Sequence, residues 1–130
     1  VNQVITPDLR VERDFSAEQF SRPISESTAS TLTDMMTKVV SESDGTGHLA
    51  AIDGVDVAGK TGTAENGKDD AGEDLPYTLW FTGFAPADDP EVAVAVVIAD
   101  GGGEAYGYEG STYELPTQIG KQVMEAVLSE

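Results

Sequence analysis

The chain has 130 residues, a length that suits one compact domain. Its 24 acidic residues outnumber its 7 basic residues, and the formal charge of −17 argues against nucleic acid or an anionic membrane as a partner. The absence of cysteine excludes disulfides, thiolate metal ligands and cysteine nucleophiles. Because His48 is the single histidine, a histidine-dependent triad or a multi-histidine metal site is also disfavoured, and we expect neither a metal nor a cofactor.

The first half of the chain contains one clear helical pattern. Residues 1–24 are mixed and polar, and they are predicted to be an irregular or extended lead-in. A helix is predicted over residues 25–43, and Ser25 or Ser27 can cap its start by accepting a backbone N–H. Five apolar residues recur with a helical period on its expected core face: Leu32, Met35, Met36, Val39 and Val40.

Three strands are predicted in the second half. Residues 55–65 begin with alternating apolar and polar side chains, residues 77–86 are rich in aromatic residues, and residues 91–100 contain the apolar run Val92–Ala99. Because that run does not alternate, we expect it to be buried on both faces, as a central strand is. The short proline-containing turn before it predicts that the second and third strands pair antiparallel.

A loop and a second helix complete the predicted elements. Residues 65–76 are acidic and contain glycine, which is typical of a solvated loop. The last helix is predicted over residues 113–129, with Thr112 as a candidate cap. Its expected apolar face consists of Leu115, Ile119, Val123 and Val127. Together these elements predict an α+β fold, in which helices cover an antiparallel sheet.

The segment from Gly54 to Thr61 offers two interpretations. It matches the phosphate-loop pattern G-x-x-x-x-G-K-[ST], which would make the protein a nucleotide hydrolase. A phosphate loop requires a helix that begins at its lysine, because the N-terminal N–H groups of that helix bind the phosphates. The glycines, aspartates and proline that follow Lys60 disfavour a helix, and the residues before it alternate as in a strand. A strand that carries Lys60-Thr61-Gly62 is therefore the preferred interpretation.

Several segments resemble the penicillin-binding transpeptidases, in particular the monofunctional class B type found in actinobacteria. Gly54–Glu65 resembles the third active-site motif of that family with its flanks, and Trp80–Pro86 and Val92–Ile98 resemble the two strands that follow the motif. The predicted helix and the turn Gly45–Gly47 are similar to the elements that precede it. The resemblance implies the C-terminal portion of the serine β-lactamase and penicillin-binding transpeptidase fold.

The resemblance also assigns roles to four consecutive residues. The expected substrate is a peptidoglycan stem peptide that ends in D-Ala-D-Ala, and β-lactams mimic that peptide; both carry a carboxylate. Thr61 would donate its hydroxyl to the carboxylate, while Lys60 would add positive charge and influence proton transfer at the serine. Gly62 would let the substrate backbone lie against the strand edge, and the backbone N–H of Thr63 would supply one donor of the oxyanion hole.

The family further requires a serine nucleophile in an S-x-x-K motif and a second motif, S-x-N. Neither motif occurs in this sequence. We therefore expect residues 1–130 to be the C-terminal part of one transpeptidase domain, inactive on its own, with the N-terminal part of that domain as its partner. The resemblance implies a location on the cell-wall side of the cytoplasmic membrane, with an anchor in a segment upstream of this chain.

Two other functions fit the same residues less well. The serine β-lactamases share the K-T-G wall, that is, the active-site strand that carries Lys60, Thr61 and Gly62 here. Their sequences resemble the segment from Trp80 to Pro86 less closely. A non-catalytic module that binds cell-wall peptide or a division protein would keep the fold without the nucleophile. Affinity for stem peptide without acylation would favour such a module.

Overall fold

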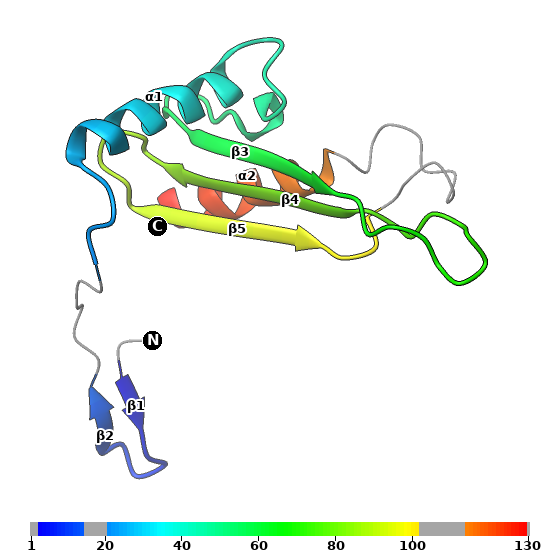
Figure 1. Ribbon diagram of the computed structural model, residues 1–130. Coiled ribbons are helices and arrows are strands. Elements are labelled where there is room, and N and C mark those ends of the chain that lie inside the picture. The colour runs from blue at the N-terminus through cyan, green and yellow to red at the C-terminus, as the bar shows by residue number, and fades with distance from the viewer. Residues whose placement is uncertain (1–2, 15–20, 102–113, 130) are drawn as a thin grey trace.

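The computed structural model describes residues 3–14, 21–101 and 114–129, whose arrangement is shown in Figure 1. They form a small β-hairpin, a three-stranded antiparallel sheet and two α-helices that pack on the sheet. In chain order the elements are β1 (Gln3–Ile5), β2 (Val11–Asp14), α1 (Glu26–Ser41), the 3-10 helix η1 (His48–Ala50), β3 (Ala58–Ala64), β4 (Thr78–Ala85), β5 (Val92–Ile98) and α2 (Leu115–Leu128). The antiparallel sheet with its helices confirms the predicted α+β class.

The main sheet has the strand order β3-β4-β5, and both neighbouring pairs are antiparallel. Strand β3 begins at Ala58 rather than at residue 55, because Gly54 has a φ of +76° and Val55 pairs with Ile52 in an isolated bridge. The prediction that Val92–Ala99 is buried on both faces is wrong: β5 is an edge strand of the described sheet, and its residues alternate between half-buried and exposed. The alternation is hidden in the sequence because apolar residues also occupy the uncovered face.

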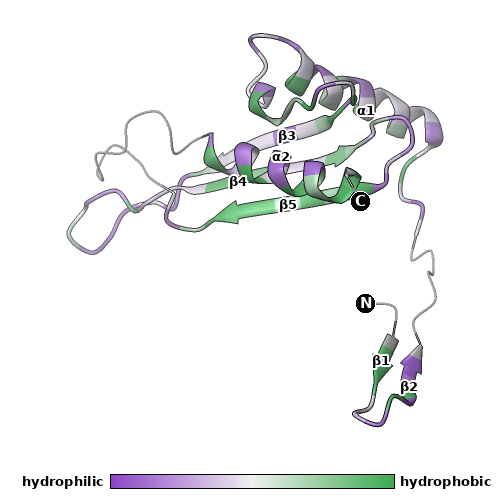
Figure 2. Cartoon of the chain, turned by 180° about the vertical axis from the view of Figure 1, so that it is seen from behind, coloured by the Kyte–Doolittle hydropathy of each residue, from purple (hydrophilic) through white to green (hydrophobic). Residues whose placement is uncertain are grey.

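One face of the main sheet is covered by both helices and holds the hydrophobic core. Phe81 on β4 is 1% exposed and belongs to one buried cluster with Val40 of α1 and Met124 of α2. Figure 2 shows α2 in front of this face of the sheet, running along β4 and the apolar strand β5. Burial of a side chain of this size contributes about 1.5–3 kcal/mol of stability.

Helix α2 packs through a different stripe from the predicted one. Its buried residues are Pro116, Thr117, Gly120 and Met124. The predicted stripe is largely exposed, with Leu115 at 40%, Val123 at 43% and Val127 at 45%. A Cβ atom at Gly120 would lie 2.5 Å from the Phe81 ring. The helix is therefore rotated so that Gly120, which has no side chain, faces that ring. Hydropathy alone does not reveal this close approach. The candidate cap Thr112 lies outside the described residues.

Helix α1 matches its predicted start but not its predicted burial. The side chain of Ser25 caps the helix by accepting a hydrogen bond from the N–H of Thr28 at 3.1 Å. Val40 is buried, whereas Leu32 is 45% exposed and Met35 is 60% exposed. The predicted core face is therefore wrong for the first half of the helix, because only the end near Val40 reaches the core.

The lead-in, predicted to be irregular or extended, contains the hairpin β1–β2, which lies apart from the main sheet in both views (Figures 1 and 2). The two strands are joined by the turn Thr6-Pro7-Asp8-Leu9, which has proline at its second position. The N–H of Leu9 donates to the carbonyl of Thr6 at 2.9 Å, and Leu9 has a φ of +62°. A type I turn followed by a left-handed residue is a common hairpin connection. The signal was therefore present in Thr6-Pro7-Asp8-Leu9. Residues 15–20 of the lead-in lie outside the described residues.

The predicted acidic loop over residues 65–76 is organised by its own hydrogen bonds. The N–H of Leu75 donates to the carbonyl of Gly67 at 2.8 Å, and the carboxylate of Asp69 accepts from the N–H of Glu73 at 2.9 Å. Lys68 and Asp74 form an exposed ion pair at 2.8 Å, a type of contact that contributes little to stability. The loop extends beyond the C-terminal end of β3 and the N-terminal end of β4 (Figure 1).

Candidate active site

The Lys60-Thr61-Gly62 triplet lies within β3, at an edge of the described sheet. The strand continues through the triplet to Ala64 and no helix begins at Lys60, which excludes the phosphate-loop interpretation. The register with β4 pairs Lys60 with Thr82, Thr61 with Phe81, Gly62 with Trp80 and Thr63 with Leu79. Because successive strand residues point to opposite faces, the triplet presents functional groups on both faces of the sheet.

Lys60 projects on the face of the sheet that the helices leave open, on the same side as Thr82. Its side chain is exposed, and its Nζ donates a hydrogen bond to the carbonyl oxygen of Thr61. It forms no ion pair with any carboxylate in the described part of the chain. An ammonium group has three donors, so Lys60 retains donors for an anionic ligand.

Thr61 points to the opposite face, toward the turn between α1 and η1. Its Oγ1 lies 2.8 Å from Oγ1 of Thr46, which is in that turn. A hydroxyl has one proton to donate and two lone pairs to accept with. Thr61 can therefore bond to Thr46 and to a ligand at the same time.

Gly62 and Thr63 continue the same wall. Together with Thr61 and Thr46 they border a hollow of about 380 Å³ between β3 and the turn after α1. That volume is in the range of small-molecule sites. The structure thus brings Thr61, Gly62 and Thr63 to one hollow, while the side chain of Lys60 projects from the other face of the strand.

The open face of the sheet is largely apolar apart from a lysine and a threonine. It is defined by Lys60, Trp80, Thr82, Ala93, Ala95 and Val97. Trp80 is 48% exposed and Val97 is 51% exposed. Large apolar side chains that adjoin one another on a sheet are normally covered in a folded protein. The open face therefore combines a cation with an uncovered apolar surface.

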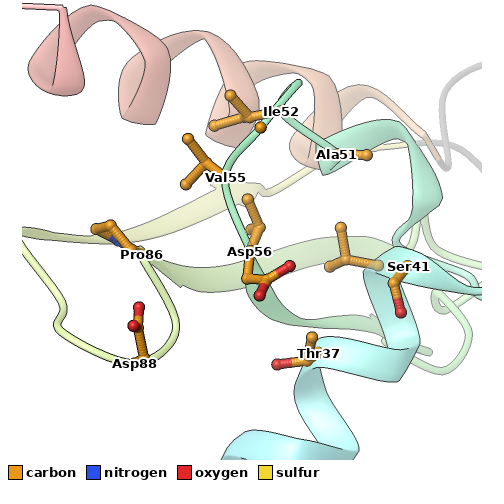
Figure 3. A pocket seen from close by; sticks show the side chains of 11 residues that line it. Thr37, Ser41, Ala51, Ile52, Val55, Asp56, Pro86 and Asp88 are labelled. Carbon is orange, nitrogen blue, oxygen red and sulfur yellow. The ribbon is translucent and has the colours of Figure 1, made fainter.

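A second hollow, of about 590 Å³, lies beside the C-terminal end of α1 (Figure 3). Ile52, Val55 and Pro86 contribute apolar groups to it, and Asp56 and Asp88 contribute carboxylates. It contains no residue of the triplet. No group of three or more metal-ligating side chains occurs in the ranges 3–14, 21–101 and 114–129.

A K-T-G triplet on a strand with an accessible edge and an antiparallel sheet covered by helices are features that the sequence resemblance implied. The chain belongs to the penicillin-binding protein transpeptidase domain family, whose model matches residues 4–125. The family predicted from the sequence is thereby confirmed.

Individual relatives agree with the family. The peptidoglycan D,D-transpeptidase PbpA of Mycolicibacterium smegmatis is 41% identical over 124 residues, which is 95% of this chain and 24% of that protein. The crystal structure of PBPA from Mycobacterium tuberculosis matches with a TM-score of 0.74 and 35% identity over 98% of this chain and 28% of that chain. The penicillin G acyl-enzyme complex of penicillin-binding protein A from M. tuberculosis matches with a TM-score of 0.72 and 34% identity, over 98% of this chain and 26% of that chain. This chain thus spans about a quarter of the relatives that it matches.

Sequence reasoning assigned no role to Thr46, although it noted the turn Gly45–Gly47 that contains it. The distance between its hydroxyl and that of Thr61 follows from the path of the chain between α1 and β3. A threonine between two glycines was the available signal.

No helix within the described ranges is both long and apolar enough to cross a bilayer.

Proposed function

We propose that the protein to which this chain belongs is a peptidoglycan D,D-transpeptidase, and that the chain supplies the K-T-G wall of its active site. The observation that carries the proposal is the position of the triplet in a chain of this family: Lys60, Thr61 and Gly62 lie on an edge strand of the described sheet. Lys60 forms no ion pair with a described carboxylate, and the hydroxyl of Thr61 borders a hollow. An edge strand can bind an extended peptide by strand addition.

The wall binds the carboxylate of a stem peptide that ends in D-Ala-D-Ala, or the equivalent carboxylate of a β-lactam. Thr61 donates its hydroxyl to the carboxylate, and Lys60 contributes positive charge and influences proton transfer at the nucleophile. Gly62 leaves the strand edge open to the substrate backbone. The N–H of Thr63 donates to the oxyanion that forms during acyl transfer, a contribution worth about 3 kcal/mol in the transition state.

The reaction proceeds through an acyl-serine intermediate. The serine oxygen attacks the carbonyl carbon of the penultimate D-Ala, the C–N bond to the last D-Ala breaks, and that amine leaves with a proton. The amine of a second stem peptide then attacks the ester, forming the crosslink and returning the proton to the serine. Because no serine in this sequence stands in an S-x-x-K motif, the nucleophile comes from another part of the protein.

The N-terminal part of the same domain is the first partner of this chain. The exposed Trp80 and Val97, on the same face of the sheet as Lys60, support this proposal, because a covering segment would bury apolar surface and bring its serine to that face. The crosslinking substrate lies outside the cytoplasmic membrane, so the domain acts on the cell-wall side, held there by an anchor elsewhere in the protein.

The test is intact-mass spectrometry of the complete protein after incubation with penicillin G. We expect one covalent penicillin adduct on the complete protein and none on the 130-residue chain. An adduct on the chain alone would contradict a nucleophile supplied from elsewhere. A complete protein that binds stem peptide without forming an adduct would instead be a non-catalytic binding module.

A further inference from the structure

The turn between α1 and η1 contributes a hydroxyl to the K-T-G wall. Oγ1 of Thr46 lies 2.8 Å from Oγ1 of Thr61, although the two residues are 15 positions apart in the sequence. Both residues border the same hollow, so a ligand that reaches Thr61 also approaches Thr46. The pair is a specific contact between the triplet and a separate element.

The backbone of this turn is fixed to the end of α1. The N–H of Gly47 donates to the carbonyl of Val39 at 3.0 Å, and the N–H of Gly45 donates to that of Glu42 at 2.9 Å. A Cβ atom at Gly45 would lie 2.3 Å from the carbonyl oxygen of Val39, so the turn fits closely against the helix. The backbone at Thr46 is therefore held against α1 and presents the threonine side chain to β3.

The direction of the hydrogen bond between the two hydroxyls determines what Thr61 can offer a ligand. If Thr61 donates to Thr46, only its lone pairs face the ligand, and an ionised carboxylate can only accept hydrogen bonds. If Thr46 donates to Thr61, the proton of Thr61 is free for the carboxylate. Hydrogen bonds in such a chain strengthen one another.

We propose that Thr46 is a positioning residue, which donates its proton to Thr61 and thereby directs the proton of Thr61 to the ligand carboxylate. This inference rests on the proposed function, because it assigns Thr61 a carboxylate partner. Thr46 acts through Thr61, and its contribution depends on the negative charge of the ligand.

The experiment measures the second-order rate of acylation of the complete protein by penicillin G and by penicillin G methyl ester, which lacks the carboxylate. Thr46→Val removes the hydroxyl at nearly constant shape, and Thr46→Ser keeps it. We expect Thr46→Val to slow acylation by penicillin G about tenfold and acylation by the ester less than about twofold. Thr46→Ser should react at close to the unmodified rate, because its hydroxyl can still donate.

A double-variant comparison tests whether Thr46 acts through Thr61. The variant that combines Thr46→Val with Thr61→Val should be no slower than Thr61→Val alone. Equal slowing with both probes, failure of Thr46→Ser to restore the rate, or multiplied effects in the double variant would each overturn the inference. An unmodified protein that forms no penicillin adduct would overturn the proposed function and this inference with it, whereas normal acylation of Thr46→Val would overturn the inference alone.

Discussion

Neighbouring residues on strand β4 show how different the two faces of the sheet are. Phe81 is 1% exposed and belongs to one buried cluster with residues of both helices, whereas Trp80, the preceding residue, is 48% exposed on the open face. The covered face is closed by residues of this chain alone. The open face bears Lys60 and lacks a cover among the described residues.

The difference separates stability from chemistry. The covered face contains the buried cluster that holds the fold together, including Val40, Phe81 and Met124. The groups proposed to bind an anionic substrate lie apart from that cluster: Lys60 is on the open face, and Thr61 and Thr63 border the hollow between β3 and the turn after α1. Substitutions of the core residues and of these proposed binding groups should therefore affect different measurements.

The largest expected effect is on the covered face. Phe81→Ala should destabilise the chain by about 3–5 kcal/mol, because it removes a buried ring and leaves a cavity. The control is Trp80→Ala, which should lower stability by about 1 kcal/mol or less, since half of that side chain is already in water. Urea unfolding of the 130-residue chain measures both values. Equal losses would mean that the two faces do not differ as described.

A charge placed on each face of β5 should have a smaller and equally asymmetric effect. Val96 faces the helices and is half-buried, whereas Val97 is 51% exposed on the open face. Val96→Asp should destabilise the chain by about 2–3 kcal/mol, and Val97→Asp by less than about 0.5 kcal/mol. In the complete protein, thermal unfolding should show that Val97→Asp is also clearly destabilising, because the proposed N-terminal part of the domain would cover the open face there. An unchanged melting temperature would contradict that cover.

The smallest effect concerns the hairpin, which lies on neither face. The hydroxyl of Thr6 and the guanidinium of Arg10 donate hydrogen bonds to Asp8 and hold the pKa of that carboxyl below its ordinary value. A lowered folded-state pKa means that the interaction stabilises the hairpin at pH values above the unfolded pKa. That stabilisation is lost as the pH falls through the folded pKa.

Carboxyl NMR titration tests this contact. We expect Asp8 to titrate at a lower pH in the unmodified chain than in Thr6→Val, which removes the first donor. The same midpoint in both chains would show that Thr6 does not set the pKa.

The fold was predictable where a local pattern decides the outcome. The helical period and the Ser25 cap correctly indicated α1, and the alternation and turn residues indicated an antiparallel sheet. Predictions failed where tertiary contacts decide. The rotation of α2 depends on the contact between Gly120 and Phe81, and the exposure of β5 depends on which face has a cover. Neither property is local to the sequence.

The candidate site was partly predictable for the same reason. The triplet and its position on a strand follow from a short motif with its flanks, so Lys60, Thr61, Gly62 and Thr63 could be singled out in advance. The proximity of Thr46 could not, because it results from how the turn after α1 returns to β3. Contacts between elements distant in sequence require the structure.

The central claim is that the wall bearing Lys60 takes part in acylation without being needed for folding. The most direct measurement is the rate of acylation by penicillin G in the complete protein for Lys60→Ala, compared with Lys68→Ala on the acidic loop. We predict a fall of about 100- to 1,000-fold for Lys60→Ala, the size expected for loss of one charge-stabilising group, with an unchanged melting temperature. Lys68→Ala should stay within about twofold, because its exposed ion pair contributes little. An unchanged acylation rate in Lys60→Ala would contradict the account.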